Sequence, residues 1–254
     1  MVQQDPSVSR RRFIKQFVVG TAFSILAGRD WLGTLVADCT PTTAANGVLR
    51  IRISDFPALQ ADNGSVRLVF NPINGNQLPS NTAFYPVLIN RAGAGQFFAL
   101  NSRCTHEFCV VPPFDAGQDA SVCPCHSSMY RIDGTVIAGS PARLPLSKFT
   151  VSFDGVDLLC IQIPNLGFSV SGSTVQNSVG PRFRLQFPTK TRLTYEVRFR
   201  QSASDAGSIV PFSTTDIGAA TVTEFTGNNS VATLYVDRTA DAGFYSVAIQ
   251  ANAG

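Results

Sequence analysis

Short runs of apolar residues, many of them alternating with polar ones, recur along the chain from residue 49 onward. The runs in the first half are LRIRI (49–53), SVRLVF (65–70), YPVLINR (85–91), QFFALN (96–101), GTVIAG (134–139), FTVSFDG (149–155) and VDLLCIQIP (156–164). Such runs, separated by Asn, Gly, Pro and Asp, predict β-strands. Asp154-Gly155, between the last two runs, predicts a hairpin turn. We therefore expect an all-β fold with a first β domain over residues 49–164.

The chain beyond residue 164 predicts a linker and then a second β unit. Residues 165–180 are rich in Gly, Ser and Asn, a composition typical of a flexible connection. The runs that follow are FRLQF (183–187), TRLTYEVRFRQ (191–201), SIVPF (208–212), AATVTEF (219–225), SVATLYV (230–236) and FYSVAIQ (244–250). Their spacing predicts a small β-sandwich over residues 181–254.

One segment of this second unit suggests its class. Residues 241–247 resemble the D-x-G-x-Y corner of immunoglobulin-like domains, with Tyr245 two residues before the position at which those domains carry a cysteine. That position holds Val247, and residues 181–254 contain neither Cys nor Trp. An immunoglobulin-like and a fibronectin-like sandwich therefore fit the pattern equally.

The N-terminal region carries a targeting signal in place of the strand pattern. Residues 9–15, SRRRFIK, resemble the twin-arginine export signal, and an apolar stretch follows at 17–28. As a helix this stretch spans ~18 Å, less than the ~30 Å of a hydrocarbon core. Counting from Phe13 to Leu32 would cover that distance. Residues 1–37 are thus interpreted as a signal or anchor helix, either cleaved or retained, followed by a linker at 38–48.

Composition narrows the possible functions. Apolar residues make up 44% of the chain and charged residues 15%, as in a folded globular protein. Twenty Lys and Arg stand against seventeen Asp and Glu, for a net charge of +3. Because these charges are spread thinly, no basic face for nucleic acid is expected.

Two short segments concentrate the metal-binding residue types. CTHEFC (104–109) and CPCHSSMY (123–130) give a C-x-H and a C-x-x-H motif, each with one further cysteine. In this β context the pair resembles the Rieske iron–sulfur family. The resemblance implies a [2Fe–2S] cluster in which Cys104 and Cys123 bind one iron and His106 and His126 the other. Structural zinc is the alternative for such residues, although C-x-H with C-x-x-H is an unusual zinc pattern.

The mixed ligand set has a chemical consequence. Four thiolates around a [2Fe–2S]²⁺ core leave a charge of about −2, whereas two thiolates and two imidazoles leave it near zero. The incoming electron then meets less repulsion, which raises the potential by on the order of several tenths of a volt. Because imidazole on ferric iron is more acidic than on ferrous iron, reduction also draws a proton.

The resemblance implies roles for the neighbouring residues as well. Cys109 and Cys125 match the pair that forms a disulfide between the two loops in Rieske proteins of cytochrome bc complexes and of the arsenite oxidase small subunit. Ser128 would donate a hydrogen bond to a bridging sulfide, and Tyr130 one to the sulfur of Cys104. Residues 139–142, GSPA, resemble the proline loop that covers the cluster.

Three residues depart from the family pattern, and two cysteines lie outside it. The family usually carries leucine, glycine and glycine where this chain has Glu107, Phe108 and Ser127. A carboxylate beside the exposed histidines would lower the potential and alter the surface on which a quinol docks. Cys160 lies within an apolar strand and is interpreted as a buried thiol, and no role is predicted for Cys39.

These observations favour an exported electron carrier without a substrate site of its own. The chain has two histidines, and with both bound to the cluster none remains for the iron site of Rieske oxygenases. The main hypothesis is the high-potential subunit of a quinol-oxidising cytochrome bc-type complex, in which His106 or His126 accepts a quinol proton. The alternatives are a subunit of another periplasmic oxidoreductase, partnered by a molybdenum subunit as in arsenite oxidase, and an adhesion or assembly protein that uses its C-terminal sandwich. In the first two cases the protein works on the extracytoplasmic side of the inner membrane.

Overall fold

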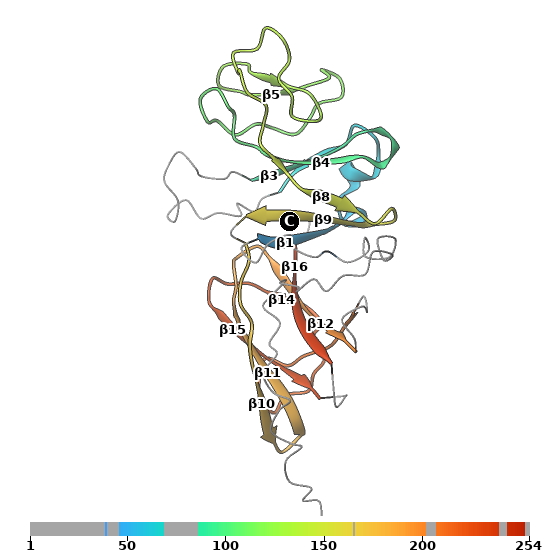
Figure 1. The fold of residues 1–254 in the computed structure, drawn as a ribbon, viewed down its shortest axis with the longest axis vertical. Coiled ribbons are helices and arrows are strands. Elements are labelled where there is room, and N and C mark those ends of the chain that lie inside the picture. The colour runs from blue at the N-terminus through green and yellow to red at the C-terminus, as the bar shows by residue number, and fades with distance from the viewer. Residues whose placement is uncertain are drawn as a thin grey trace, which may run out of the picture.

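The computed structural model is built almost wholly of β-strands and short turns, which confirms the all-β prediction (Figure 1). The residues that it describes are 39, 46–68, 86–164, 166–201, 207–238 and 243–251. The predicted N-terminal signal or anchor helix, residues 1–37, lies outside them. Within the described residues no helix is long and apolar enough to span a membrane.

The strands form four sheets. The largest has the order β13-β12-β16-β1-β9-β8, with β14 also paired to β12; the others are β2-β3-β4-β7, β10-β11-β15 and β5-β6. The strands of the first half are β1 (Asn46–Arg52), β2 (Ser65–Arg67), β3 (Val87–Arg91), β4 (Phe97–Asn101), β5 (Ser121–Val122), β6 (Met129–Tyr130), β7 (Lys148–Phe149), β8 (Val151–Phe153) and β9 (Leu158–Pro164). Those of the second half are β10 (Ser171–Asn177), β11 (Gly180–Pro188), β12 (Thr194–Arg200), β13 (Ser208–Ile209), β14 (Phe225–Thr226), β15 (Val231–Asp237) and β16 (Phe244–Gln250). Three 3-10 turns join the early strands: η3 (Ile53–Asp55), η4 (Pro57–Gln60) and η5 (Gly93–Gly95).

The predicted hairpin at Asp154-Gly155 is confirmed. It joins β8 to β9, and Gly155 has a φ of 85°, in the left-handed region that favours glycine. The Asp154 carboxylate accepts hydrogen bonds from the backbone N–H groups of Val156, Asp157 and Leu158, at 2.8, 2.9 and 3.0 Å. These bonds hold the pKa of Asp154 below its usual value, against the effect of burial.

Two predicted boundaries differ from the structure. Residues 134–139 form no strand but one isolated bridge, Tyr130 to Val136, because they fold back as a loop that supports the second motif. The Gly- and Ser-rich segment 165–180 contains β10, which pairs with β11 along its whole length. The apolar side chains of β11 provide the surface that this weakly patterned strand needs.

A single sheet connects the two halves of the chain. Strand β1 pairs with β9 on one side and, in parallel, with β16 on the other, with Leu49 opposite Ile249. One hydrophobic core accordingly includes Leu49 and Ile161 from the first half together with Phe187 and Ile249 from the second. The sheets of the second half lie at the opposite end of the molecule from β5 (Figure 1). An immunoglobulin-like arrangement there is not confirmed, and Asp241 and Ala242 of the predicted corner lie outside the described residues.

A buried carboxylate reinforces this connection. Glu196 of β12 accepts a hydrogen bond from Arg52 of β1 at 3.1 Å and forms an ion pair with Arg198 at 3.3 Å. Arg52 also donates to the side chain of Gln250 in β16, at 3.2 Å. Since an unpaired buried carboxylate is costly, these partners fix three adjacent strands relative to one another.

Cys39 and Cys160 form a disulfide, so the interpretation of Cys160 as a buried free thiol is wrong. The bond links Cys39, which precedes β1 in the chain, to Cys160 in β9, and the pair packs against Val48 and Leu158. A thiol in a buried strand looks the same in sequence whether it is free or paired, because the partner is 121 residues away. The disulfide fixes the N-terminal segment at residue 39 to the central sheet.

Removing this disulfide should destabilise the folded protein. For Cys39→Ser combined with Cys160→Ser, we expect the free energy of unfolding to fall by roughly 2–4 kcal/mol, because the long closed loop gains freedom in the unfolded chain. Denaturant unfolding monitored by circular dichroism provides the measurement. An unchanged midpoint and slope would show that the bond carries no stability.

Candidate metal centre

The first cysteine motif folds as a tight loop between β4 and β5. The backbone N–H of Cys104 donates to the carbonyl of Cys109 at 2.8 Å, and that of Phe108 donates to the carbonyl of Cys104 at 3.0 Å. Phe108 has a φ of 62°. The loop therefore closes on itself around Cys104, with one left-handed residue at its fifth position.

The second motif folds in the same way. The backbone N–H of Cys123 donates to the carbonyl of Ser128 at 2.8 Å, and that of Ser127 donates to the carbonyl of Cys123 at 3.0 Å. Ser127 has a φ of 56°. The two loops thus share one backbone arrangement. Each has a cysteine at its first position and a histidine two or three residues later.

The two left-handed positions are also positions at which the sequence departs from the family pattern. Phe108 and Ser127 stand where a glycine is usual, and both positions require a positive φ. For a residue with a side chain this costs roughly 1–2 kcal/mol. The Phe108 side chain is 53% exposed, and the guanidinium of Arg103 lies 3.8 Å from the centre of its ring. That cation–π contact offsets part of the cost.

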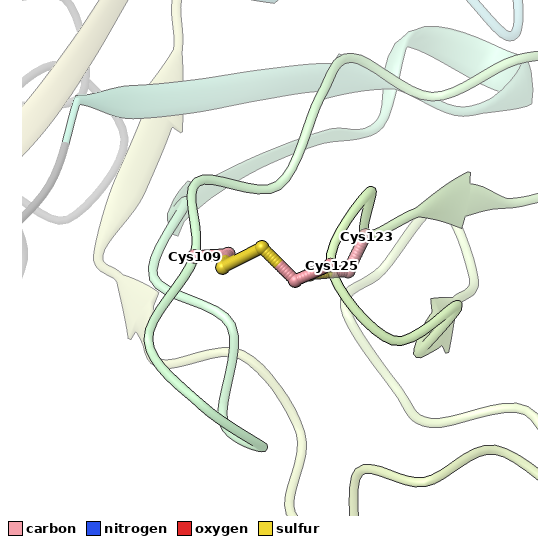
Figure 2. Close-up of side chains that lie close together, drawn as sticks. All are labelled: Cys109, Cys123 and Cys125. Atoms are coloured by element: carbon pink, nitrogen blue, oxygen red, sulfur yellow. A yellow bond between two sulfur atoms is a disulfide. The ribbon is translucent and has the colours of Figure 1, made fainter.

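A disulfide between Cys109 and Cys125 ties the loops together, as the resemblance implied (Figure 2). Their Cα atoms are 6.4 Å apart, and Cys123 lies next to the bond. The three sulfur atoms lie within 4.8 Å of one another. Because two of them are oxidised to the disulfide, these three residues do not form a metal site of their own.

Cys104 and Cys123 are the free cysteines of the described chain, and both are buried. Burial raises the pKa of Cys104, but hydrogen bonds from Tyr130 and from the backbone N–H of His106 outweigh it, so the net shift is downward. For Cys123, burial and the nearby Cys104 sulfur raise the pKa. The Cys104 sulfur is therefore the one better prepared to carry negative charge.

Tyr130 is fully buried beneath the first loop, with its Oη 3.3 Å from the Sγ of Cys104. Burial, followed by the hydrogen bond with Cys104, raises the pKa of Tyr130 to about 12, so it keeps its proton at neutral pH. Its oxygen accepts a hydrogen bond from the backbone N–H of Thr105 at 3.0 Å. The phenol proton therefore remains available to the sulfur.

Thr105, which the sequence did not single out, competes for that proton. Its hydroxyl lies 3.0 Å from the Tyr130 oxygen and donates its own hydrogen to the carbonyl of Leu144, at 2.6 Å. The threonine oxygen can then only accept from Tyr130. A thiolate at Cys104 would win this competition, since a charged acceptor bonds more strongly.

The two histidines lie side by side at the ends of the loops. Their ring centroids are 5.0 Å apart, with the rings edge to face. Nδ1 of His106 is buried and has no hydrogen-bond partner among the described residues. Nε2 of the half-exposed His126 lies 3.5 Å from a carboxylate oxygen of Glu107. One nitrogen thus points inward and the other toward the surface.

The loop that resembles the proline loop supports the second motif. The Ser140 hydroxyl accepts a hydrogen bond from the backbone N–H of Met129 at 2.9 Å, and Ala142 packs in the same small core as both free cysteines. Pro141 is exposed. Its role as a cover for the cluster stays a prediction.

The residues present fit an inorganic cluster. Two buried thiols and two imidazoles come together, and the buried hydroxyl of Ser128, like Nδ1 of His106, has no partner among the described residues. Buried polar atoms are rarely left without a partner. Sulfur and nitrogen ligands with hydrogen-bond donors around them are those of an iron–sulfur centre.

Comparisons with known proteins agree with this donor set. The Rieske [2Fe-2S] domain family matches residues 73–150. The cytochrome b6-f complex iron-sulfur subunit of Prochlorococcus marinus (strain MIT 9215) is 28% identical over 158 residues, covering 59% of this chain and 84% of that protein. The corresponding subunit of strain MIT 9515 is 41% identical with the same coverage.

A solved structure also resembles the chain. The cyanobacterial plasma membrane Rieske protein PetC3 from Synechocystis PCC 6803 is 31% identical, over 30% of this chain and 76% of that chain, with a TM-score of 0.27. So partial a superposition carries no argument about the fold. The family match and the sequence relatives imply a [2Fe–2S] cluster. The chain therefore belongs to the Rieske [2Fe–2S] family of electron-transfer proteins.

Proposed function

We propose that this chain is the exported, high-potential Rieske subunit of a quinol-oxidising cytochrome bc-type complex. Cys104 and Cys123 would bind one iron of the cluster, and His106 and His126 the other. The observation that carries the proposal is the pair of matching loops, which bring two free buried thiols and two imidazoles together beside buried polar atoms without protein partners. When bound, a [2Fe–2S] cluster with these ligands takes up and releases one electron.

The chain's own residues prepare this site for an added electron. The Tyr130 phenol donates toward the Cys104 sulfur, and the buried Ser128 hydroxyl is free to donate to a bridging sulfide. Hydrogen bonds to the sulfurs stabilise the reduced form more than the oxidised form, because the added charge strengthens them. The Cys109–Cys125 disulfide keeps the two loops in register.

The surface nitrogen of His126 supports the quinol assignment. The His126 side chain is half-exposed, and its ring lies next to both His106 and Glu107. A quinol hydroxyl that reaches this surface can form a hydrogen bond with an imidazole nitrogen and give it a proton. The relatives from Prochlorococcus marinus are subunits of a cytochrome b6-f complex, which favours a cytochrome b-type partner.

Export by the twin-arginine route is supported by the disulfides. Both Cys39–Cys160 and Cys109–Cys125 are of a kind that persists outside the reducing cytosol. A folded, cluster-bearing protein suits the twin-arginine signal at residues 9–15. The extracytoplasmic side of the membrane is therefore the proposed location.

Glu107 favours a second candidate function. Its carboxylate stands beside the surface nitrogen of His126, where a neutral quinol would otherwise bind. In a periplasmic oxidoreductase that resembles arsenite oxidase, a partner's cofactor would supply the electrons and no quinol would dock. A molybdenum-containing subunit is the proposed partner in that case.

The cluster assignment predicts which cysteines are needed to hold iron. Purified protein should contain iron and inorganic sulfide in equal amounts and give a Rieske-type electron paramagnetic resonance signal after reduction. Cys123→Ser should lose both, because one iron loses a thiolate. The double variant Cys39→Ser/Cys160→Ser, which removes cysteines far from the loops, should keep both. Zinc without sulfide in the wild-type protein would exclude the assignment.

Redox titration as a function of pH tests whether reduction of the cluster is coupled to a histidine proton, as quinol oxidation requires. If a histidine takes up a quinol proton, the midpoint potential should fall on the alkaline side, where the oxidised form loses its imidazole protons first. Protein-film voltammetry over a range of pH provides the measurement. A potential independent of pH would count against proton-coupled oxidation of quinol.

The hydrogen bond from Tyr130 should raise the reduction potential. Its loss in Tyr130→Phe should lower the midpoint potential by on the order of 50 mV, since a hydrogen bond to a charged group contributes ~1–2 kcal/mol more in the reduced state. Tyr195→Phe is the matched control, because Tyr195 is equally buried and hydrogen bonds to Lys190 in the second half. Equal potentials for the two variants would contradict the role.

A further inference from the structure

Glu107 reaches across from the first loop to the histidine of the second. Its Oε2 lies 3.5 Å from Nε2 of His126, and both side chains are largely exposed, at 60% and 46%. Ligand-type atoms of His106, Glu107 and His126 all lie within 4.8 Å of one another. The carboxylate is thus part of the same surface as both histidines.

The position of this carboxylate is set by the loops and not by a flexible segment. The backbone bond from Phe108 to Cys104 closes the turn that contains Glu107, and the Cys109–Cys125 disulfide fixes that turn against the second loop. Glu107 immediately follows His106 along the chain. The side chain therefore extends from a constrained backbone toward His126.

Glu107 contacts Nε2 of His126, the imidazole nitrogen that would not bind iron. Nδ1 of His106 is buried and has no partner in the part of the chain that the structure describes, which marks the inward, ligand-bearing side of that ring. Nε2 of His126 faces Glu107 at the surface, so its ring has Nδ1 left for iron. A carboxylate can only accept, so it can hydrogen bond to Nε2 only while that nitrogen carries a hydrogen; when the nitrogen is free to accept a quinol proton, the carboxylate acts through its charge and its position.

The distance also indicates how firmly Glu107 is held. A formed hydrogen bond between an N–H group and a carboxylate measures about 2.7–2.9 Å, and 3.5 Å is longer than that. The carboxylate therefore acts mainly through its charge and can swing into solvent. The Glu107 carboxylate lies close enough to Nε2 of His126 to hinder access to that nitrogen, and no short hydrogen bond keeps it there.

We propose that Glu107 is a positioning residue that competes with an incoming quinol for Nε2 of His126. This inference rests on the proposed function. A quinol hydroxyl must displace the carboxylate before it can bond to the imidazole, so Glu107 weakens quinol binding. Its negative charge beside a centre that gains an electron also lowers the reduction potential.

Two substitutions at Glu107 test the proposal. Glu107→Gln removes the charge and keeps the shape, and Glu107→Leu removes both the charge and the acceptor. Both should raise the midpoint potential of the cluster-loaded protein at neutral pH, and the rise should shrink as salt is added. In membranes containing the whole complex, Glu107→Leu should lower the KM for a short-chain quinol several-fold.

Glu224→Gln is the matched control. Glu224 is a half-exposed glutamate in the second half of the chain, 3.9 Å from Arg52, so its loss removes the same charge far from the loops. It should leave both the potential and the KM at their wild-type values. A Glu107→Gln potential equal to that of Glu224→Gln would overturn the electrostatic role, and an unchanged KM in Glu107→Leu would overturn the competition.

The iron, the sulfide and the paramagnetic resonance signal of each variant separate the two possible failures. If the wild-type protein lacks the Rieske signal, the proposed function itself fails. If every variant shows that signal and the Glu107 variants behave like the wild type, only the inference about Glu107 fails. Glu107→Asp, which keeps the charge, should retain a potential closer to the wild type than Glu107→Gln does.

Discussion

The disulfide between Cys109 and Cys125 is the constraint on which the site depends. Each loop closes on its own cysteine through two backbone hydrogen bonds, but among the described residues no strand pairing joins one loop to the other. The disulfide supplies that link, and the small core around Tyr130 supports it from below. With both in place, two thiols and two imidazoles lie close together in the two loops.

The loops stand at one end of an elongated β structure whose central sheet is shared by both halves of the chain (Figure 1). The parallel pairing of β1 with β16 and the buried Glu196 make the second half an extension of the first. The Cys39–Cys160 bond ties residue 39 to the same sheet. The end that carries the two cysteine loops therefore lies apart from the sheets of the second half.

Local chemistry was predictable from the sequence, and long-range pairing was not. The Asp154-Gly155 hairpin depends on neighbouring residues, and the structure confirms it. The C-x-H and C-x-x-H motifs are also local, and their two histidine rings lie 5.0 Å apart. The pairing of Leu49 with Ile249 and the Cys39–Cys160 bond depend on residues far apart, for which sequence spacing carries no signal. Strand β10 was missed because its Ser- and Gly-rich sequence forms a strand only against β11. The two left-handed backbone positions could not be predicted, because Phe108 and Ser127 occupy them in place of glycine.

Mössbauer spectroscopy of ⁵⁷Fe-enriched protein tests the central claim, an iron pair with sulfur ligands on one metal and nitrogen ligands on the other. The oxidised protein should give two ferric doublets of equal area, with the added electron localised on the histidine-bound iron after reduction. A single doublet, as four equivalent thiolates would give, would contradict it, as would the absence of iron.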